Sequence, residues 1–395
     1  MTIKKFYLKA CDTSTNFIVR CSLLVARLRV LYDEQLKTIN YQRILLIHFS
    51  LFLIPSIKAQ DAIYSQFYNT PQLLNPAMTG IFQGSVRANV NYRQQWSGVF
   101  SDVAIRTASA GVDYRFHGIA DDYIAIGLSG ISDNAGGYSD LQTNSGAFAA
   151  SYLKQLGGDR YSTSSQYLVA GLQVGMAQKK ITNNLWYDRQ FDPSTYTINT
   201  SLSNGEFLPQ SNNYTDFNLG LMYYDVIDDN HSIYFGGAVD HINQPKVSFL
   251  GNTKEVLRQR LVFHGGGQFP LRDELTVLPS VLVTLQGPSM YSTVQTSFRY
   301  TNNDWNELAI RAGGGFRIVN GFVYDPTNKA GGNNLILDAL IISMMFEKSH
   351  FIFGLSYDIH TSSIVSPTNG RGAWELSLIF VAPEKTRVNT ACPKF

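Results

Sequence analysis

The sequence predicts an all-β fold, a transmembrane antiparallel β-barrel of about 14 strands with an N-terminal plug or strap. First, after about Gln83 the chain divides into segments of roughly ten residues in which every second residue is apolar, the pattern of transmembrane strands. Second, only 16% of the residues are charged and 13% are aromatic, whereas about 25% charged residues are usual in soluble domains. Third, an export signal precedes the first of these segments.

Residues 1–59 are expected to be a leader with a signal peptide that is cleaved after Ala59. Lys37 and Arg43 precede an apolar run at 44–54, and a short stretch ending in Ala59 follows it, which is the order of a secretory signal. A helical anchor that is not cleaved is the alternative. Residues 1–40 have no core-forming pattern, which suggests an unusually long leader or a translation start placed too far upstream.

Two classes of protein are excluded by hydropathy and charge. No stretch reaches the ~18 consecutive apolar residues of a membrane-spanning helix, which excludes a polytopic helical membrane protein. The leader carries nine Lys and Arg and three Asp and Glu, so residues 60–395 keep 23 basic and 27 acidic side chains and a formal charge of −4. A chain with this balance lacks the phosphate-neutralising surface of nucleic-acid-binding proteins.

No catalytic, metal or cofactor site is predicted. The cysteines Cys11, Cys21 and Cys392 lack the spacing of a zinc site or a disulfide framework. The histidines show no zinc-protease pair, and the glycine runs 265–267 and 313–315 lack the Lys-Ser/Thr of a phosphate loop. Those glycines are better explained by a close approach of the backbone or by a bend of the barrel wall.

The first segment shows the alternation most clearly. Its odd and even positions differ completely in character: Val86, Ala88, Val90 and Tyr92 form one face, and Arg87, Asn89, Asn91 and Arg93 form the other. Because the side chains of a strand alternate between two faces, one face suits lipid and the other suits a wet lumen.

Fourteen segments of this kind follow one another, an even number as closed bacterial barrels require. They are 86–93, 104–116, 122–132, 141–154, 168–176, 216–225, 232–242, 260–266, 275–286, 291–300, 307–318, 335–346, 350–359 and 372–381. The longest insert, about 179–214, lacks sustained alternation and is expected to be an extracellular loop or a lumenal lid.

Nine tyrosines near the strands are expected to form aromatic girdles at the membrane interfaces. They are Tyr92, Tyr114, Tyr123, Tyr152, Tyr167, Tyr223, Tyr234, Tyr300 and Tyr357. Aromatic packing inside a soluble sandwich is the alternative explanation.

Residues 60–83 precede the first strand without alternation and are expected to form the plug or strap, with the barrel over 84–395. In this stretch Gln66-Phe67, Pro71, Asn75-Pro76-Ala77 and Gly80, followed by Tyr92-Arg93-Gln94-Gln95-Trp96, fit the pattern Q-[FY]-x(3)-P-x-x-x-N-P-A-x-x-G and Y-R-x-Q-W. This order resembles the PorP/SprF family of the type IX secretion system.

Later segments agree with this resemblance, which covers essentially all of 60–395. They are 185–191, 216–221, His241 with Pro245, Gln286-Gly287, 354–358, 372–377 and the tail Cys392-Pro393-Lys394-Phe395.

The resemblance implies an outer-membrane barrel that helps to export or surface-anchor large adhesins and other cargo with a type B C-terminal domain, often in gliding bacteria. Its expected partners are this secreted cargo, periplasmic and outer-membrane components of the secretion system, and outer-membrane lipid, with no cofactor and no nucleic acid. The residues expected to shape the lumen are Asn75, Pro76, Ala77, Gly80, Tyr92, Arg93, Gln95, Trp96, Tyr357, Asp358 and Glu375.

Three other functions are consistent with parts of the pattern. A channel for small hydrophobic compounds, like the fatty-acid transporters, would need an apolar pocket that reaches a lateral opening. A barrel enzyme would need a nucleophile, a base and an orienting group on the outer rim, and no such set is recognisable. A secreted β-sandwich adhesin would hide its apolar face between two sheets.

Overall fold

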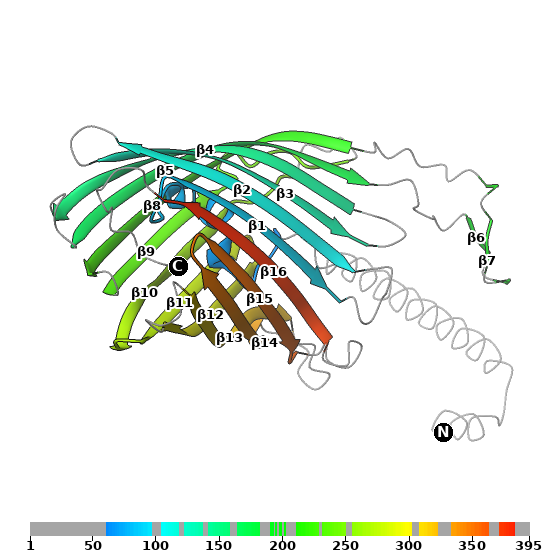
Figure 1. The fold of residues 1–395 in the computed structure, drawn as a ribbon. Helices are drawn as coiled ribbons and strands as arrows, with labels where there is room; N and C mark the ends of the chain where they lie inside the picture. The colour runs from blue at the N-terminus through cyan, green and yellow to red at the C-terminus, as the bar shows by residue number, and fades with distance from the viewer. Residues whose placement is uncertain are drawn as a thin grey trace, which may run out of the picture. The chain divides into compact units, whose positions relative to one another are not determined.

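The alternating segments form a closed antiparallel barrel of fourteen strands in the described part of the chain (Figure 1). The computed structural model describes residues 61–96, 104–117, 122–136, 141–158, 164–181, 190–192, 194–195, 197–199, 201–202, 211–228, 231–249, 255–301, 308–322, 333–362 and 371–383. The predicted leader 1–59 and the tail from Cys392 lie outside these residues. No helix in the described ranges is both long and apolar enough to cross a membrane.

All fourteen predicted strands are confirmed, most of them with longer bounds. The barrel strands are β1 (Val86–Gln95), β2 (Ile105–His117), β3 (Tyr123–Ala135), β4 (Leu141–Gly158), β5 (Ser165–Ile181), β8 (Ser211–Asp228), β9 (His231–Asp240), β10 (Arg260–Arg272), β11 (Leu275–Gln286), β12 (Ser289–Thr301), β13 (Leu308–Phe322), β14 (Asn333–Lys348), β15 (Phe351–His360) and β16 (Arg371–Ala382).

Each barrel strand pairs with its neighbour in the chain, and β1 pairs with β16 to close the wall. The one exception in chain order is the pairing of β5 with β8. The insert between them is shorter than predicted, because β5 extends to Ile181 and β8 begins at Ser211. It contains a small two-stranded sheet of β6 (Phe191–Asp192) and β7 (Thr197–Ile198).

The apolar positions of the strands face outward, as predicted. The side chains of Leu172, Leu221 and Phe235, for example, are 59%, 60% and 59% exposed. The alternating polar positions of β1 are buried instead, with Arg87 and Asn91 among them. An apolar outer belt around a closed wall suits lipid, since a closed sheet has no open edge of unpaired backbone groups.

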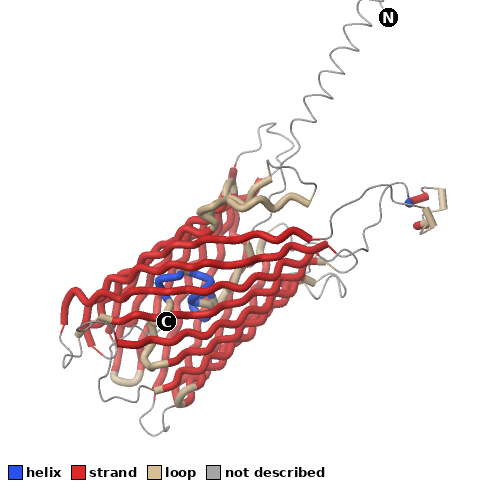
Figure 2. Tube along the Cα trace, turned by 90° about the horizontal axis from the view of Figure 1, so that it is seen from above, coloured by secondary structure: helices blue, strands red, loops and turns tan. Residues whose placement is uncertain are grey.

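The lumen differs from the predicted wet interior, because the N-terminal segment fills it. This segment, 61–84, contains the short helices η1 (Phe67–Asn69), α2 (Pro71–Leu74) and η2 (Pro76–Met78), which Figure 2 shows inside the ring of strands. Nearly all of its side chains are buried. The polar inward positions of the wall therefore face another part of the same chain.

The tyrosine girdle is only partly correct. Tyr114, Tyr152, Tyr300 and Tyr357 lie on the outer surface, between 37% and 46% exposed. Tyr123, Tyr167 and Tyr234 are instead buried inside the barrel, and the rings of Tyr167 and Tyr224 stack with centroids 5.1 Å apart. They lie at inward positions of their strands. There they belong to a buried cluster with apolar residues of the strap instead of facing lipid.

The two ends of the barrel differ in the length of their connections. At one end, which we call the short-turn end, the longest connections between strands are 159–164 and 302–307. At the opposite end, the long-loop end, the connections include 182–210 and 241–259. Strand β1 begins at the short-turn end.

Candidate functional site in the barrel lumen

The segment 61–84, which we call the strap, crosses the whole lumen. Asp61 contacts His241 just beyond the end of β9, at the long-loop end. Asn75 contacts the middle of β8 and β9, and the carbonyl of Gly84 accepts a hydrogen bond from β2 near the short-turn end. The strap therefore descends through the barrel in chain order before it enters β1.

A buried ion cluster, the lumen cluster, lies in the half of the lumen nearer the long-loop end. Arg93 Nη2 is 2.8 Å from Asp358 Oδ2, and Arg93 Nη1 is 3.2 Å from Glu375 Oε2. Arg317 is 2.9 Å from Asp358 and 2.9 Å from Asp338. Isolated buried charges are strongly unfavourable, and mutual pairing with further hydrogen bonds offsets that cost. The cluster thereby fixes β1, β13, β15 and β16 relative to one another.

The strap binds to this cluster through its backbone and through the Ser65 side chain, whose hydroxyl also accepts a hydrogen bond from Arg93 at 2.8 Å. Glu375 accepts hydrogen bonds from two consecutive amides, Ser65 N at 2.8 Å and Gln66 N at 3.0 Å. The Ser65 hydroxyl donates to Asp358 at 2.6 Å, and Gln295 donates to the Ser65 carbonyl at 2.6 Å. Charge-assisted hydrogen bonds of this kind are stronger than neutral ones, so the carboxylates that hold Arg93 also hold the strap.

Asn75 organises the middle of the strap. Its Oδ1 accepts a hydrogen bond from Ala77 N at 2.9 Å, which makes it the N-cap of η2 with Pro76 at the first helical position. Its Nδ2 lies 2.9 Å from His264 Nε2 and donates to the Leu221 carbonyl at 3.2 Å. One side chain thus both shapes the strap and ties it to three strands of the wall, β8, β9 and β10.

Glycines in the wall allow this part of the strap to come close. A Cβ atom on Gly171 would collide with the strap backbone at Pro76 and Ala77, and one on Gly220 would collide with the side chain of Asn75. Only residues without a side chain fit there. The Asn-Pro-Ala sequence of the strap and the glycines of β5 and β8 are therefore complementary.

A second ion pair holds the strap near the short-turn end. Arg87 Nη2 is 2.7 Å from Asp113 Oδ2, and the same carboxylate oxygen accepts a hydrogen bond from Gly80 N at 2.7 Å. Arg87 also donates to the carbonyls of Met78 and Ile81. The bond network fixes the turn through which the strap leaves the lumen.

Gly80 has to be glycine for two reasons. Its φ of +81° is a left-handed conformation that residues with a side chain rarely adopt. A Cβ atom at this position would also collide with Ala125 on β3.

At the long-loop end, Asp61 lies in a group of donors that we call the mouth clamp: His241, Arg260 and Gln286. Asp61 Oδ2 is 2.8 Å from His241 Nε2, 3.3 Å from Gln286 Nε2 and 3.5 Å from Arg260 Nη1. The Asp61 amide in turn donates to Gln286 Oε1 at 3.1 Å. Both the side chain and the backbone of this residue are held.

Asp61 and His241 stabilise each other's charged form. Burial disfavours the charge on Asp61, but Arg260 and His241 outweigh this effect and hold the pKa of Asp61 well below its usual range. Burial likewise disfavours a charged His241, but Asp61 and Asp216 overcome it and raise the pKa of His241 to about 9. His241 is therefore an imidazolium at neutral pH.

The structure brings three of the predicted site residues, Arg93, Asp358 and Glu375, into one cluster. Asn75, Pro76, Ala77 and Gly80 all lie in the strap that fills the lumen. Their role in shaping it stays a prediction that rests on this geometry.

The remaining predicted residues lie at the rim or outside the lumen. Trp96 leaves β1 with a φ of +63° and donates from Nε1 to His360 at 3.1 Å, and Gln95 is half-buried at the end of β1. Tyr92 and Tyr357 face outward, and the Tyr92 ring packs at 5.2 Å against Trp374. Including these two tyrosines among lumen-shaping residues is wrong, because alternation places them opposite to Arg93 and Asp358.

Sequence reasoning missed several residues that hold the strap. Arg87 belongs to the polar face of the first predicted strand, and Asp113 is its direct cross-strand partner in the register of β1 and β2. An opposite-charge pair at matched inward positions is a detectable signal. Ser65, Arg317 and the clamp residues give no such local signal.

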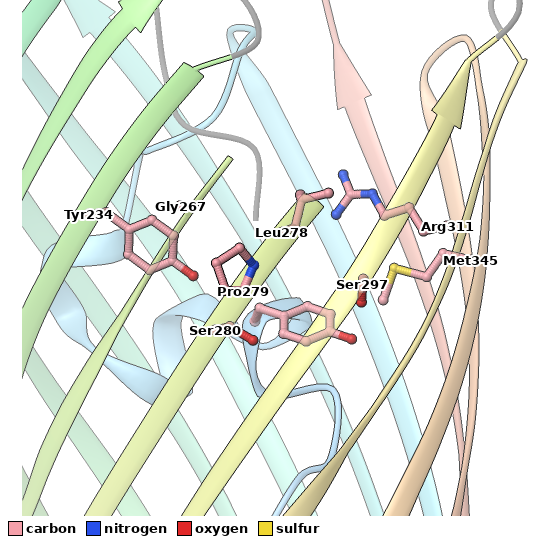
Figure 3. Close-up of a pocket in the computed structure, with 9 residues that line it drawn as sticks. Tyr234, Gly267, Leu278, Pro279, Ser280, Ser297, Arg311 and Met345 are labelled. Atoms are coloured by element: carbon pink, nitrogen blue, oxygen red, sulfur yellow. The ribbon is translucent and has the colours of Figure 1, made fainter. Parts of the chain in front are cut away.

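A small cavity remains between the strap and the opposite wall (Figure 3). It measures about 20 Å³ and is lined by Tyr68, Tyr234, Gly267, Leu278, Pro279, Ser280, Ser297, Arg311 and Met345. A space of this size holds about one water molecule, whereas apolar cavities that bind benzene measure about 150 Å³.

Features considered for catalysis and metal binding have structural explanations. A Cβ atom on Gly266 would lie 2.6 Å from the Pro279 carbonyl, and one on Gly313 would lie 2.6 Å from Ser297 Cα, which confirms close backbone approach at both glycine runs. Among the described residues, no three His, Cys, Asp or Glu side chains are grouped so as to hold a metal ion.

Comparison with protein families gives one match. The family described as type IX secretion system membrane protein PorP/SprF matches residues 56–380. No curated protein matches the chain. The family match spans the strap and almost the entire barrel.

Several solved barrels resemble the fold at low identity. The CymD monoaromatic hydrocarbon channel has a TM-score of 0.42 and 10% identity, covering 80% of this chain and 93% of that one. The Pseudomonas putida toluene transporter TodX has a TM-score of 0.41 and 9% identity, with coverage of 80% and 93%. The translocator domain of the autotransporter NalP from Neisseria meningitidis has a TM-score of 0.33 and 9% identity, with coverage of 80% and 94%. None of the three is similar enough to inform function.

Proposed function

Because the chain belongs to the PorP/SprF family of type IX secretion system membrane proteins, we propose that it is a non-enzymatic barrel that helps export or surface-anchor cargo with a type B C-terminal domain. The protein is an outer-membrane β-barrel associated with type IX secretion. The family match over 56–380 is the observation that carries the proposal.

In this proposal the barrel works as a docking platform rather than as a conduit. The strap lies across the lumen on two buried ion pairs and on the Asn75 contacts, and a cavity between it and the wall measures about 20 Å³. Cargo would meet the extracellular face, and periplasmic or lipoprotein components of the machinery would meet the opposite face. The same filling of the lumen speaks against the channel for small hydrophobic compounds.

Deleting the gene tests the role in secretion. We expect one or a few large adhesins with a type B C-terminal domain to be lost from the cell surface or shed into the medium, as measured by comparing surface and medium proteomes with the parent strain. Such a protein should also be recovered with the tagged barrel from detergent extracts. Complementation with the wild-type gene is the control. A second complementation uses Arg106→Met, a change at an exposed position of β2, and controls for expression of a variant barrel. An unchanged surface together with impaired uptake of a hydrophobic compound would favour the channel instead.

Conductance in planar lipid bilayers tests whether the strap closes the lumen. The intact barrel should show little ion conductance. Removal of residues 61–79 should produce a conducting pore, because the strap occupies the lumen between the Arg93–Asp358 and Arg87–Asp113 ion pairs. Equal, high conductance of both proteins would show that the strap does not close the barrel.

A further inference from the structure

The mouth clamp has the organisation of a binding site for a carboxylate. Its three donors come from separate parts of the wall: His241 follows β9, Arg260 begins β10 and Gln286 ends β11. All three converge on one carboxylate, that of Asp61, which is 26% exposed. Convergent donors at the rim of a rigid sheet are a preorganised site.

The donors keep partners of their own besides Asp61. His241 Nδ1 is 2.8 Å from Asp216 Oδ2, and Arg260 Nη2 is 2.7 Å from Asp240 Oδ2. Gln286 Nε2 lies 3.4 Å from the Arg258 carbonyl. The wall thus orients His241 and Arg260 independently, and Asp61 enters a site that is already formed.

The position of the site follows from the direction of the strands. Outer-membrane barrels have short periplasmic turns and longer extracellular loops, so the long-loop end faces the cell exterior. His241 lies in the long connection 241–259, and Asp61 is the first described residue of the strap. The strap therefore runs from the extracellular mouth to the periplasmic end, and Asp61 lies two residues after the predicted cleavage at Ala59.

We propose that the mouth clamp is a carboxylate-binding site whose ligand is the chain's own Asp61, and that it fixes the free end of the strap at the extracellular mouth. This inference depends on the orientation of the barrel and not on the proposed role in secretion.

An epitope inserted between Gln60 and Asp61 tests the direction of the strap. We expect antibody to label intact cells at a level close to that of permeabilised cells. The same epitope inserted in the periplasmic turn between Asp273 and Glu274 should be labelled only after permeabilisation. Labelling of the N-terminal epitope only in permeabilised cells would overturn the proposal.

Asp61→Asn in the epitope-carrying protein tests the clamp itself. The neutral amide loses the charge attraction of His241 and Arg260, so external protease should remove the epitope at least several-fold faster from intact cells, while the barrel keeps its heat-modifiable migration in gels. Asp192→Asn is the matched control, because the Asp192 carboxylate accepts hydrogen bonds from its neighbours in the chain, among them Ser194 N and Oγ. Equal cleavage rates of the Asp61→Asn and control proteins would show that no clamp holds the strap end.

Discussion

The lumen cluster and the mouth clamp hold the same strap with opposite chemistry. At the lumen cluster, the wall supplies the carboxylates of Asp358 and Glu375, and the strap supplies two backbone amides and the Ser65 hydroxyl as donors. At the mouth clamp, the strap supplies the carboxylate of Asp61, and the wall supplies the donors. The first contact is therefore spread over backbone and side-chain groups of Ser65 and Gln66, whereas the second depends on one residue, Asp61.

The two sites also differ in their access to water. The side chains of Arg93, Asp358 and Glu375 are at most 3% exposed, but those of His241 and Asp61 are 10% and 26% exposed. A buried charge that loses its partner is left uncompensated, whereas an exposed one is hydrated. Breaking the lumen cluster should thus disturb the barrel, and breaking the clamp should free only the end of the strap.

The largest effect is expected for Arg93→Met. It leaves Glu375 without its cation in the dry lumen, and the loss of one partner from a buried pair typically costs about 3–5 kcal/mol. Heat-modifiability and urea unfolding of the barrel in liposomes would measure this cost. Arg106→Met, at an exposed position of β2, should change stability little, and equal effects of the two changes would contradict the importance of the lumen cluster.

A smaller effect is expected for Gly171→Ala. The added methyl group collides with the strap backbone at Pro76 and Ala77, and overpacking of this kind costs about 1–3 kcal/mol. Reduced stability should be accompanied by higher bilayer conductance, because the strap is displaced rather than the wall. Gly146→Ala on β4 is the control, since its nearest neighbour would be 4.0 Å away, and a silent Gly171 variant would show that the strap does not pack on β5.

His241→Gln should affect stability least. His241 is buried, but Asp61 is 26% exposed and keeps Arg260 and Gln286 as partners, so the loss of stability should be smaller than for Arg93→Met. Unfolding of the barrel should be unchanged, but Asp61 loses its 2.8 Å contact and external protease should reach the strap end faster. A large drop in barrel stability would instead place the clamp among the elements that hold the wall.

The clamp should also weaken in alkali. The pKa of His241 is raised from 6.5 to about 9 by Asp61 and Asp216 against the effect of burial. Its contribution is therefore fully present below pH 6.5 and is lost as the pH rises through about 9. The pKa of Asp61 is lowered, so this group weakens the clamp only in strong acid. Protease accessibility of the strap end measured from pH 6 to 10 should rise near pH 9 in the wild type and not in His241→Gln.

The sequence by itself determined the strands and the two faces of the wall. Side chains of a strand alternate, so the apolar and polar positions of β1 already separate lipid from lumen, and the inward positions of Arg93, Asp358 and Glu375 follow from the same alternation. The Asn-Pro-Ala motif likewise indicates the position of the strap in the sequence.

Only the tertiary structure decided what the inward side chains touch. Asp61 meets His241 and Gln286 across separations of 180 and 225 residues, and no local pattern encodes such a pairing. For the same reason Tyr123 and Tyr234 could be assigned to a girdle although they pack inside, because a tyrosine satisfies an aromatic core as well as a membrane interface. Closure of the wall around the strap brings these distant residues together, and it is a property of the whole chain.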